Sequence, residues 1–320
     1  TLHHVQNLLP NPGPPSRPPE RAILPPPGKP GVAQRSLHDA QNKMLLPGMP
    51  VRMEGQPATG DAAVDEAYDA LGASYDFFWK VLRRDSIDNK GFALVGSVHY
   101  GQGYENAFWN GAQMVFGDGD GEIFQRFTRS LDVVAHELAH GVTESTAGLI
   151  YANQSGALNE SLSDVFGILT KQFVLGHTVE QADWLIGADL LTPKINGRGL
   201  RSMSHPGTAY DDPLLGKDPQ PDHMREFVIT QEDNGGVHIN SGIPNRAFYL
   251  AARALGGFAW KKAGVIWYDA LCDKRLNPDA DFDAFARLTV DHAAQRFGAR
   301  EVEAVRQGWA QTGIEITETL

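Results

Sequence analysis

His136 and His140 lie four positions apart, and this spacing restricts the conformation of the segment that carries them. On a helix, residues i and i+4 share one face, so both imidazoles would point to the same side, one turn apart. Two such imidazoles can bind one Zn²⁺, and Glu137 beside them can reach a water at the metal. Apolar residues at helical spacing, with Ser130 as an N-cap, favour a helix over residues 130–146. For the motif alone, two histidines on a solvated helix face are the alternative interpretation.

A second helix is predicted over residues 157–174, where apolar residues again recur at helical spacing. Its other face carries Glu160, Asp164 and Lys171. Carboxylates opposite an apolar face are usually just solvated, but Glu160 can complete a set of two histidines and one glutamate. Such a set leaves a fourth position open for water, as catalytic zinc requires. The two helices together therefore predict a catalytic zinc centre.

Two further side chains of this second helix are candidates for orienting the ligand histidines. Asp164, one turn after Glu160, is placed to accept the free N–H of His136. Asn159 is the corresponding candidate for His140. Hydrogen bonds of this kind fix the tautomer of a histidine, so that its other ring nitrogen can face the metal.

The composition excludes several classes of protein. Of 320 residues, 42% are hydrophobic and 9% aromatic, which is typical of a globular chain and excludes a disordered or fibrous one. The net charge of −11 argues against nucleic acid or an anionic membrane as a partner. No apolar run is long enough to span a bilayer. Cys272 is the single cysteine, which excludes an intrachain disulfide, and we expect it to pack rather than react.

Residues 1–35 differ from the rest of the chain, because they hold ten of its 20 prolines. We expect this segment to run extended, with at most a short helix over residues 1–9. It is interpreted as the remnant of a pro-segment or as a linker. The chain begins Thr-Leu-His-His, without a methionine or a signal peptide, so we expect a processed or truncated product.

The remaining residues indicate an α+β fold with two lobes. Residues 36–147 are expected to form a mixed N-terminal lobe that ends in the histidine helix, and residues 148–320 a helical C-terminal lobe. Gly298 stands where a left-handed helix cap is expected. The other expected elements are a helix over 64–82, strands over 92–100 and 108–116, a turn at 117–121, and helices over 244–256, 259–274, 281–297 and 300–311.

With these residues assembled, the chain resembles the thermolysin-like zinc metallopeptidase family. The resemblance covers residues 95–320 best and rests on four ordered motifs: NAFWNG at 106–111, HELAHGVTESTAGLIY at 136–151, GALNESLSD at 156–164 and DNGGVHINSG at 233–242. The short N-terminal lobe is similar to that of the protealysin-like subgroup, whose members carry a short pro-segment. The resemblance implies a two-lobed fold around the zinc-binding helix, and a secreted, monomeric enzyme that acts on peptides or proteins.

The resemblance also implies a role for each matching position. His136, His140 and Glu160 would bind zinc, and Glu137 would be the catalytic base. The remaining roles are stabilisation of the tetrahedral intermediate by Tyr151 and His238, orientation of His238 by Asp233, and substrate binding by Asn106, Ala107, Trp109 and Arg201.

A primary specificity pocket is implied as well, with Arg201 at its base. It would select a large hydrophobic residue on the carboxyl side of the cleaved bond. From the residues alone, plain core packing would be the preferred interpretation of the apolar side chains that form it, which are Phe124, Phe127, Val133, Ile186, Leu190 and Leu200.

The chain departs from the family where many relatives hold two calcium ions. Asp132 and Asp183 match two of the acidic ligands, but Lys171, Leu185 and Ala188 replace others. We expect the ammonium of Lys171 to lie near Asp132, and near Asp183, in place of calcium. The hypothesis is that an internal ion pair replaces the double calcium site, and that calcium is absent there.

Three functions stay open at this point. The first is an active zinc endopeptidase. The second is an inhibited proform or a non-catalytic zinc-binding protein that works by interaction; a silenced protein would be expected to lose Glu137, His238 or a metal ligand, and none is lost. The third is a metallo-aminopeptidase, for which no acidic anchor for a free amine is identified.

Overall fold

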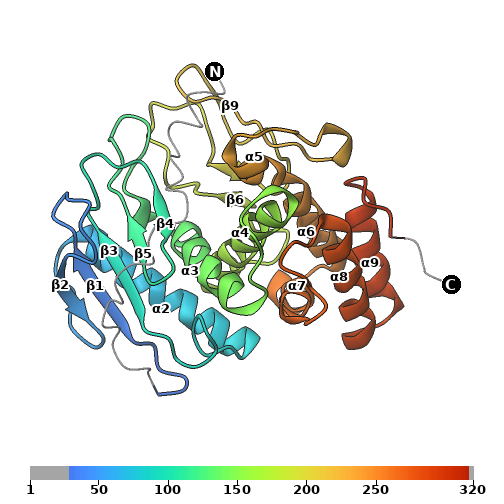
Figure 1. Cartoon of the computed structure of the whole chain (residues 1–320), viewed down its shortest axis with the longest axis horizontal. Helices are drawn as coiled ribbons and strands as arrows, with labels where there is room; N and C mark the ends of the chain where they lie inside the picture. Colours follow the sequence, from blue (N-terminus) through green and yellow to red (C-terminus); the bar gives the residue numbers. More distant parts are fainter. Residues whose placement is uncertain (1–28, 317–320) are drawn as a thin grey trace.

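The computed structural model describes residues 29–316, so the short helix expected at residues 1–9 and most of the proline-rich segment lie outside it. A mixed sheet and one long helix form one end of the molecule, and the helices α6 to α9 form the other (Figure 1). The helices α3 and α4 lie between these two parts. The predicted α+β architecture, mixed at its N-terminal end and helical at its C-terminal end, is confirmed. The boundaries expected at residues 35 and 147 stay predictions.

The sheet has five strands in the order β2-β1-β3-β5-β4. The pairs β1/β3 and β3/β5 are parallel, whereas β1/β2 and β4/β5 are antiparallel. In this order β4 is an edge strand. The bounds are Arg35–Asp39 for β1, Met49–Met53 for β2, Leu94–Val98 for β3, Ala107–Trp109 for β4 and Met114–Phe116 for β5.

The prediction of one continuous strand over residues 108–116 is wrong. The segment folds into the antiparallel strands β4 and β5, because a tight turn separates them. Asn110 starts this turn, and its side-chain Oδ1 accepts hydrogen bonds from the backbone N–H groups of Ala112 and Gln113. Gly111 follows with φ of +91°, a conformation that glycine adopts without strain.

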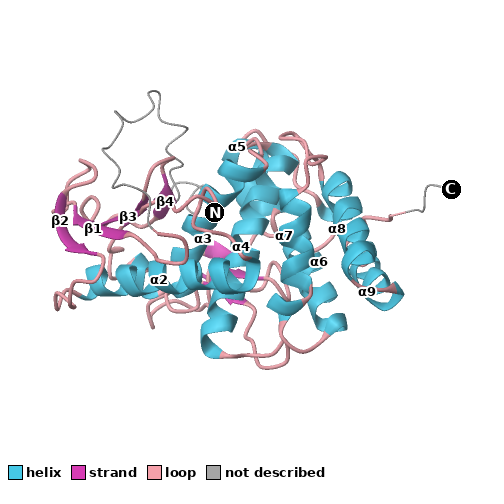
Figure 2. Cartoon of the chain, turned by 90° about the horizontal axis from the view of Figure 1, so that it is seen from below, coloured by secondary structure: helices cyan, strands magenta, loops and turns pink. Residues whose placement is uncertain are grey.

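The helix α2, Ala62–Leu82, packs against one face of the sheet (Figure 2). It begins where Asp61 accepts hydrogen bonds from the backbone N–H groups of Ala63 and Val64, as an N-cap should. Its buried residues include Leu71, and the aromatic pair Phe77 and Phe78 turns toward α4. The apolar periodicity of this segment predicted the helix to within a turn.

The helices α3, Leu131–Thr146, and α4, Asn153–Leu175, form the centre of the molecule. Gly167 on α4 allows them to approach closely, because a Cβ there would lie 2.5 Å from the backbone oxygen of Asp132. The expected N-cap position of Ser130 is confirmed, but the expected side-chain capping bond is not formed. Ser130 occupies the N-cap position, but its hydroxyl donates to the carboxylate of Asp132 instead of accepting a backbone N–H.

The C-terminal helices are packed around a cluster of tryptophan and phenylalanine rings, in which Trp267 and Trp309 stack with centroids 5.9 Å apart. Gly298 does not form a left-handed cap: it has an extended φ and serves as the N-cap of the last helix. No helix within residues 29–316 is long and apolar enough to cross a membrane. The helices are α5, Asp233–Asn240, α6, Gly242–Leu255, α7, Ala263–Cys272, α8, Phe282–Arg296, and α9, Ala299–Ala310.

Short elements complete the described chain. Three are 3-10 helices, and four are two-residue strands in the connection between α4 and α5. They are Phe127–Arg129, Met224–Glu226 and Ala259–Lys261 for the 3-10 helices, and Leu185–Ile186 (β6), Arg201–Ser202 (β7), Asp211–Asp212 (β8) and Gly216–Lys217 (β9) for the strands.

His99 ties the start of α2 to the loop that follows β5. Its Nε2 lies 3.0 Å from an oxygen of Asp61, and its Nδ1 lies 2.8 Å from an oxygen of Asp118. The hydrogen bond to Asp118 outweighs partial burial, and together with Asp61 it raises the pKa of His99 to about 9. The protonated ring therefore bridges two carboxylates at neutral pH.

This bridge predicts a pH-dependent contribution to stability. The folded-state pKa is above the unfolded value of about 6.5, so the stabilisation is complete below that pH and is lost as the pH rises through about 9. The melting temperature of wild type should exceed that of His99→Gln at about pH 6, and the difference should shrink by about pH 10. A difference that stays constant over this range would contradict the charged bridge.

Candidate active site

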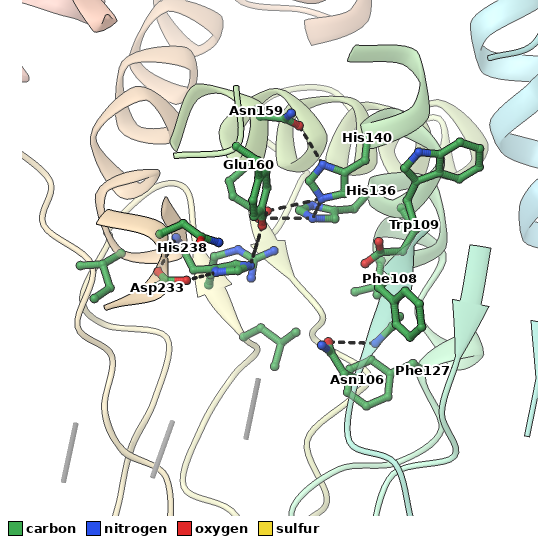
Figure 3. A pocket seen from close by; sticks show the side chains of 18 of the residues that line it. Asn106, Phe108, Trp109, Phe127, His136, His140, Asn159, Glu160, Asp233 and His238 are labelled. Atoms are coloured by element: carbon green, nitrogen blue, oxygen red, sulfur yellow. Dashed lines mark hydrogen bonds and ion pairs between the residues drawn. The ribbon is translucent and has the colours of Figure 1, made fainter. Parts of the chain in front are cut away.

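A cavity of about 950 Å³ opens between the sheet and the helical part of the molecule. Residues of β4, α3, α4 and α5 line it, together with residues of the loops between α4 and α5. Figure 3 shows His136, His140 and Glu160 gathered on one side of it, with Asn106 and Phe127 opposite. The cavity therefore joins segments from both ends of the chain.

His136, His140 and Glu160 bring three potential metal ligands together, all within 4.8 Å of one another. The Nε2 atoms of the two histidines are 3.0 Å apart. Each lies 3.4 Å from one oxygen of Glu160. Glu160 is 1% exposed, and its Oε2 has no hydrogen-bond partner among the described residues.

The partners of the other ring nitrogens show that this set fits a cation. His136 Nδ1 donates to Asp164 Oδ1 at 2.8 Å, and His140 Nδ1 donates to Asn159 Oδ1 at 2.8 Å. When both rings are neutral, their Nε2 atoms carry lone pairs that face each other and the carboxylate of Glu160. A positive ion relieves the repulsion between these groups, and zinc prefers this combination of ligands. The structure thus brings together all five residues that the sequence predicted for this centre.

The pKa values of the two buried histidines shift in opposite directions, although burial acts to lower both. Burial lowers the pKa of His140 to about 4, and the charge of His136 acts in the same direction, against that of Glu160. Burial also acts to lower the pKa of His136, but the hydrogen bond to Asp164 and the carboxylate of Glu160, 3.4 Å from Nε2, outweigh it and raise the pKa to about 10. His136 thus has a carboxylate partner at Nδ1, whereas His140 has the amide of Asn159.

Asp164 is itself held by residues from outside the two central helices. Arg201 makes a bidentate ion pair with it, with Nε 2.7 Å from Oδ2 and Nη2 2.6 Å from Oδ1. Asn245 of α6 donates its Nδ2 to Oδ2 at 2.8 Å. Arg201 is therefore neutralised before any substrate enters.

Glu137 lines the cavity beside the metal ligands and is only 6% exposed. Burial is the largest influence on this carboxyl group and raises its pKa to about 7. The negative charge of Glu160 acts in the same direction, whereas His136 opposes it.

Tyr151 and His238 both lie beside Glu160, one of the three potential metal ligands. The hydroxyl of Tyr151 donates to Glu160 and lies 3.2 Å from Nε2 of His238. Asp233 holds His238 twice: its carboxylate accepts the backbone N–H at 2.8 Å and the ring Nδ1 at 2.6 Å. Burial acts to lower the pKa of His238, but Glu160 and Asp233 outweigh it and raise the pKa to about 9.

The local sequence explains how Asp233 reaches His238. Residues 234–236 leave helical geometry, with φ values of +50°, +86° and +78°. Glycine occupies the second and third of these positions, where a left-handed backbone carries no steric penalty. This turn brings the Asp233 carboxylate against the first helical turn that carries His238.

The predicted substrate residues line the same cavity, with two exceptions. Ile186 and Leu190 are fully buried and do not line it, because they pack in the core behind it. Trp109 donates its indole N–H to Glu144 at 2.6 Å. The residues that do line the cavity are Asn106, Ala107, Trp109, Phe124, Phe127, Val133, Leu200 and Arg201.

Lys171 lies among the acids that the sequence grouped with it. Its Nζ is 3.2 Å from Asp132 Oδ2, 3.1 Å from Asp183 Oδ2 and 3.4 Å from the backbone oxygen of Leu185. Burial acts to lower the pKa of Lys171, but Asp132 and Asp183 outweigh it and raise the pKa. Asp132 has 0% exposure and depends on this ammonium for charge compensation.

Sequence reasoning missed several polar residues of the site. Asn245, Gln220 and Ser163 are buried and contact Asp164, the backbone of His238 and the ring of His140, respectively. One signal was available for Asn245, which is an asparagine on the apolar face of a helix. For Gln220 the sequence offers no such signal, because it lies in an irregular loop.

Comparisons with known proteins agree with this geometry. The model of the thermolysin metallopeptidase catalytic domain matches residues 42–144, and that of the thermolysin metallopeptidase alpha-helical domain matches residues 147–314. The chain is 64% identical to the extracellular metalloprotease of Pectobacterium carotovorum subsp. carotovorum over 318 residues, which cover 99% of this chain and 90% of that protein.

Two further relatives extend the comparison. Thermolysin of Alicyclobacillus acidocaldarius subsp. acidocaldarius is 41% identical over 289 residues, or 87% of this chain and 50% of that protein. The solved structure of the precursor of protealysin, a metalloproteinase from Serratia proteamaculans, is similar with a TM-score of 0.88 at 64% identity. It covers 92% of this chain, which covers 91% of it. These matches confirm the resemblance inferred from the four sequence motifs.

The Lys171 cluster predicts a large effect on stability. Lys171→Met leaves the buried carboxylate of Asp132 without its cation and should lower the free energy of unfolding by about 3–5 kcal/mol. Lys194→Met is the matched control, because Lys194 pairs with Glu122 on the surface and should cost less than about 1 kcal/mol. Urea denaturation measures both, and equal effects of the two substitutions would contradict the buried pair.

Proposed function

This chain belongs to the thermolysin metallopeptidase family, which makes it a zinc metalloendopeptidase, and we propose that Glu137 is its general base and that it cleaves before large hydrophobic residues. The proposed zinc ligands are His136, His140 and Glu160. The observation that carries the proposal is the convergence of these three ligands with a buried glutamate in one large cavity. A protein that only bound zinc would not need Glu137 beside the three ligands.

Zinc bound there acts as a Lewis acid toward the peptide carbonyl and favours the ionisation of water. Glu137 takes the proton from the attacking water and later delivers it to the leaving amine. Its burial supports this role, because a carboxylate outside bulk water is a stronger base than an exposed one. Glu137 directly follows His136 in α3, so the helix also holds this base next to the metal ligands.

Tyr151 and His238 supply hydrogen-bond donors for the negative charge that develops on the carbonyl oxygen. Both lie on the side of Glu160 that faces the cavity, and their polar atoms are 3.2 Å apart. Asp233 accepts from Nδ1 of His238, so Nε2 can donate when the ring is protonated. Donors fixed in this way typically contribute about 100-fold or more to the rate.

An apolar pocket supports the proposed substrate preference. Phe124, Phe127, Val133 and Leu200 line it, and Arg201 beside them is neutralised by Asp164. A large hydrophobic side chain therefore meets apolar surface there rather than an unpaired charge. The proposed substrates are peptides and proteins, and cleavage occurs on the amino side of Leu, Phe, Ile or Val.

We further propose that the protein is secreted and that residues 1–35 are the remnant of a pro-segment. Two relatives carry the word extracellular in their names, and the similar solved structure is that of a precursor. An inhibited proform is the alternative state of the same enzyme, and it differs in being active only after residues 1–35 are removed.

The third proposal is that Lys171 replaces calcium between α3, α4 and β6. Its ammonium occupies the space between Asp132, Asp183 and the Leu185 carbonyl, which are all oxygen donors of the kind that calcium prefers. A fixed positive charge in this space repels a second cation.

The catalytic proposal predicts that Glu137→Gln removes activity while the metal stays bound. The rate of cleavage of a casein substrate should fall at least about 100-fold, because the amide cannot accept the proton from water. Zinc content, measured on the same sample, should remain one ion per chain. Glu122→Gln, a surface substitution, serves as the control.

Two outcomes would separate the alternatives. Activity that survives Glu137→Gln would exclude Glu137 as the base. Wild type that is inactive with residues 1–35 and active without them would identify the inhibited proform.

The calcium proposal predicts that the stability of wild type is independent of calcium. Calcium added to calcium-free, zinc-loaded protein should leave its melting temperature unchanged. Lys171→Glu returns a carboxylate to the cluster and should instead gain a calcium-dependent rise in melting temperature. A rise of many degrees in wild type would exclude the replacement of calcium by Lys171.

A further inference from the structure

Asp164 receives four hydrogen bonds, which use all the lone pairs of its carboxylate. Oδ1 accepts from His136 and from Nη2 of Arg201, and Oδ2 accepts from Nε of Arg201 and from Nδ2 of Asn245. The four donors come from α3, β7 and α6. The plane of the carboxylate, and with it the direction of the bond to His136, is therefore set from three separate segments.

Asn245 differs from the other two partners of Asp164. Arg201 neutralises the charge of Asp164, and His136 is a proposed metal ligand. Asn245 is neutral and does not line the cavity. It stands in the first turn of α6, which follows the segment carrying His238. Its side chain is 0% exposed and reaches across to α4, 81 positions earlier in the chain.

The unpaired atom of Asn245 shows that this contact is not simply good packing. Nδ2 bonds to Asp164, but Oδ1 has no hydrogen-bond partner among the described residues. A buried amide oxygen without a partner costs free energy, and a leucine of the same branched shape would avoid this cost. The amide also has only one usable orientation, because the flipped form would place Oδ1 against the carboxylate of Asp164.

We propose that Asn245 is a positioning residue for the metal centre, and this inference rests on the zinc site proposed above. Its N–H holds Oδ2 of Asp164, so that Oδ1 stays aligned with Nδ1 of His136. The aligned hydrogen bond keeps the proton on Nδ1 and the lone pair of Nε2 directed at the ligand position. Asn245 acts through Asp164 and touches neither metal nor substrate.

Zinc release separates this role from a structural one. Asn245→Leu keeps the branched shape of the side chain and removes the donor, and Asn245→Ala is a second variant that removes the donor by truncation. Each should release zinc to a chromogenic chelator at least about 10-fold faster than wild type, in the range found when partners of ligand histidines are lost. The Co²⁺-substituted variants should also show shifted visible absorption bands, because His136 is no longer held in one orientation.

Thr289→Val is the control for loss of stability alone. Thr289 is buried and accepts a hydrogen bond from Trp309 Nε1 at 2.9 Å, far along the chain from the metal ligands. This variant should lower the melting temperature of the metal-free protein without faster zinc release. Faster release in Thr289→Val, matching that of the Asn245 variants at equal loss of stability, would overturn the positioning role.

The remaining outcomes distinguish this inference from the proposed function. If the wild-type protein failed to bind one zinc ion per chain, both the proposed zinc site and the role of Asn245 would be overturned. Wild type that binds one zinc, with Asn245→Leu and Asn245→Ala releasing it at the wild-type rate and with unchanged Co²⁺ spectra, would overturn the inference alone.

Discussion

The close packing of α3 on α4 is the constraint on which the rest of the site depends. Gly167 makes it possible, because any side chain there would collide with the backbone of Asp132. At this separation α4 can deliver a potential ligand, Glu160, and the partners of both histidines from a single face. If α4 lay further from α3, longer side chains would be needed to reach the two histidines. Longer side chains have more conformational freedom and would hold the ring nitrogens less firmly.

Charge compensation explains much of what surrounds these two helices. Three carboxylates around these helices each have a cationic partner: Asp164 has Arg201, Asp132 has Lys171, and the partly buried Asp233 has His238. Glu160 has no such dedicated cation, and one of its oxygens is left without a partner. In an interior where unpaired charge is costly, such a carboxylate beside two imidazoles fits an ion.

The helix periodicity correctly predicted that His136, His140 and Glu160 lie together, because they stand on two short segments where spacing alone sets direction. The sequence was less informative where contacts are distant or turns are tight. Residues 108–116 were predicted as one strand although Asn110 and Gly111 interrupt the apolar run, because so short an interruption did not distinguish a turn from a continuous strand. Ile186 and Leu190 could not be distinguished from cavity residues by hydrophobicity alone. Asn245 meets Asp164 only through the packing of α6 on α4, which no local pattern encodes.

The strand order of the sheet has a consequence for which proteins this enzyme can attack. β4 ends the order and its residues line the cavity, so an extended chain along its outer edge would meet backbone groups at the spacing of another strand, apart from the Ala107 N–H that Asn106 Oδ1 already accepts. In a helical segment of a target protein, the backbone N–H and C=O groups already bond to each other, so they cannot pair with the edge of β4. Susceptibility would then depend on how readily a target protein opens locally, and loosely folded chains would be degraded long before compact ones with the same residues.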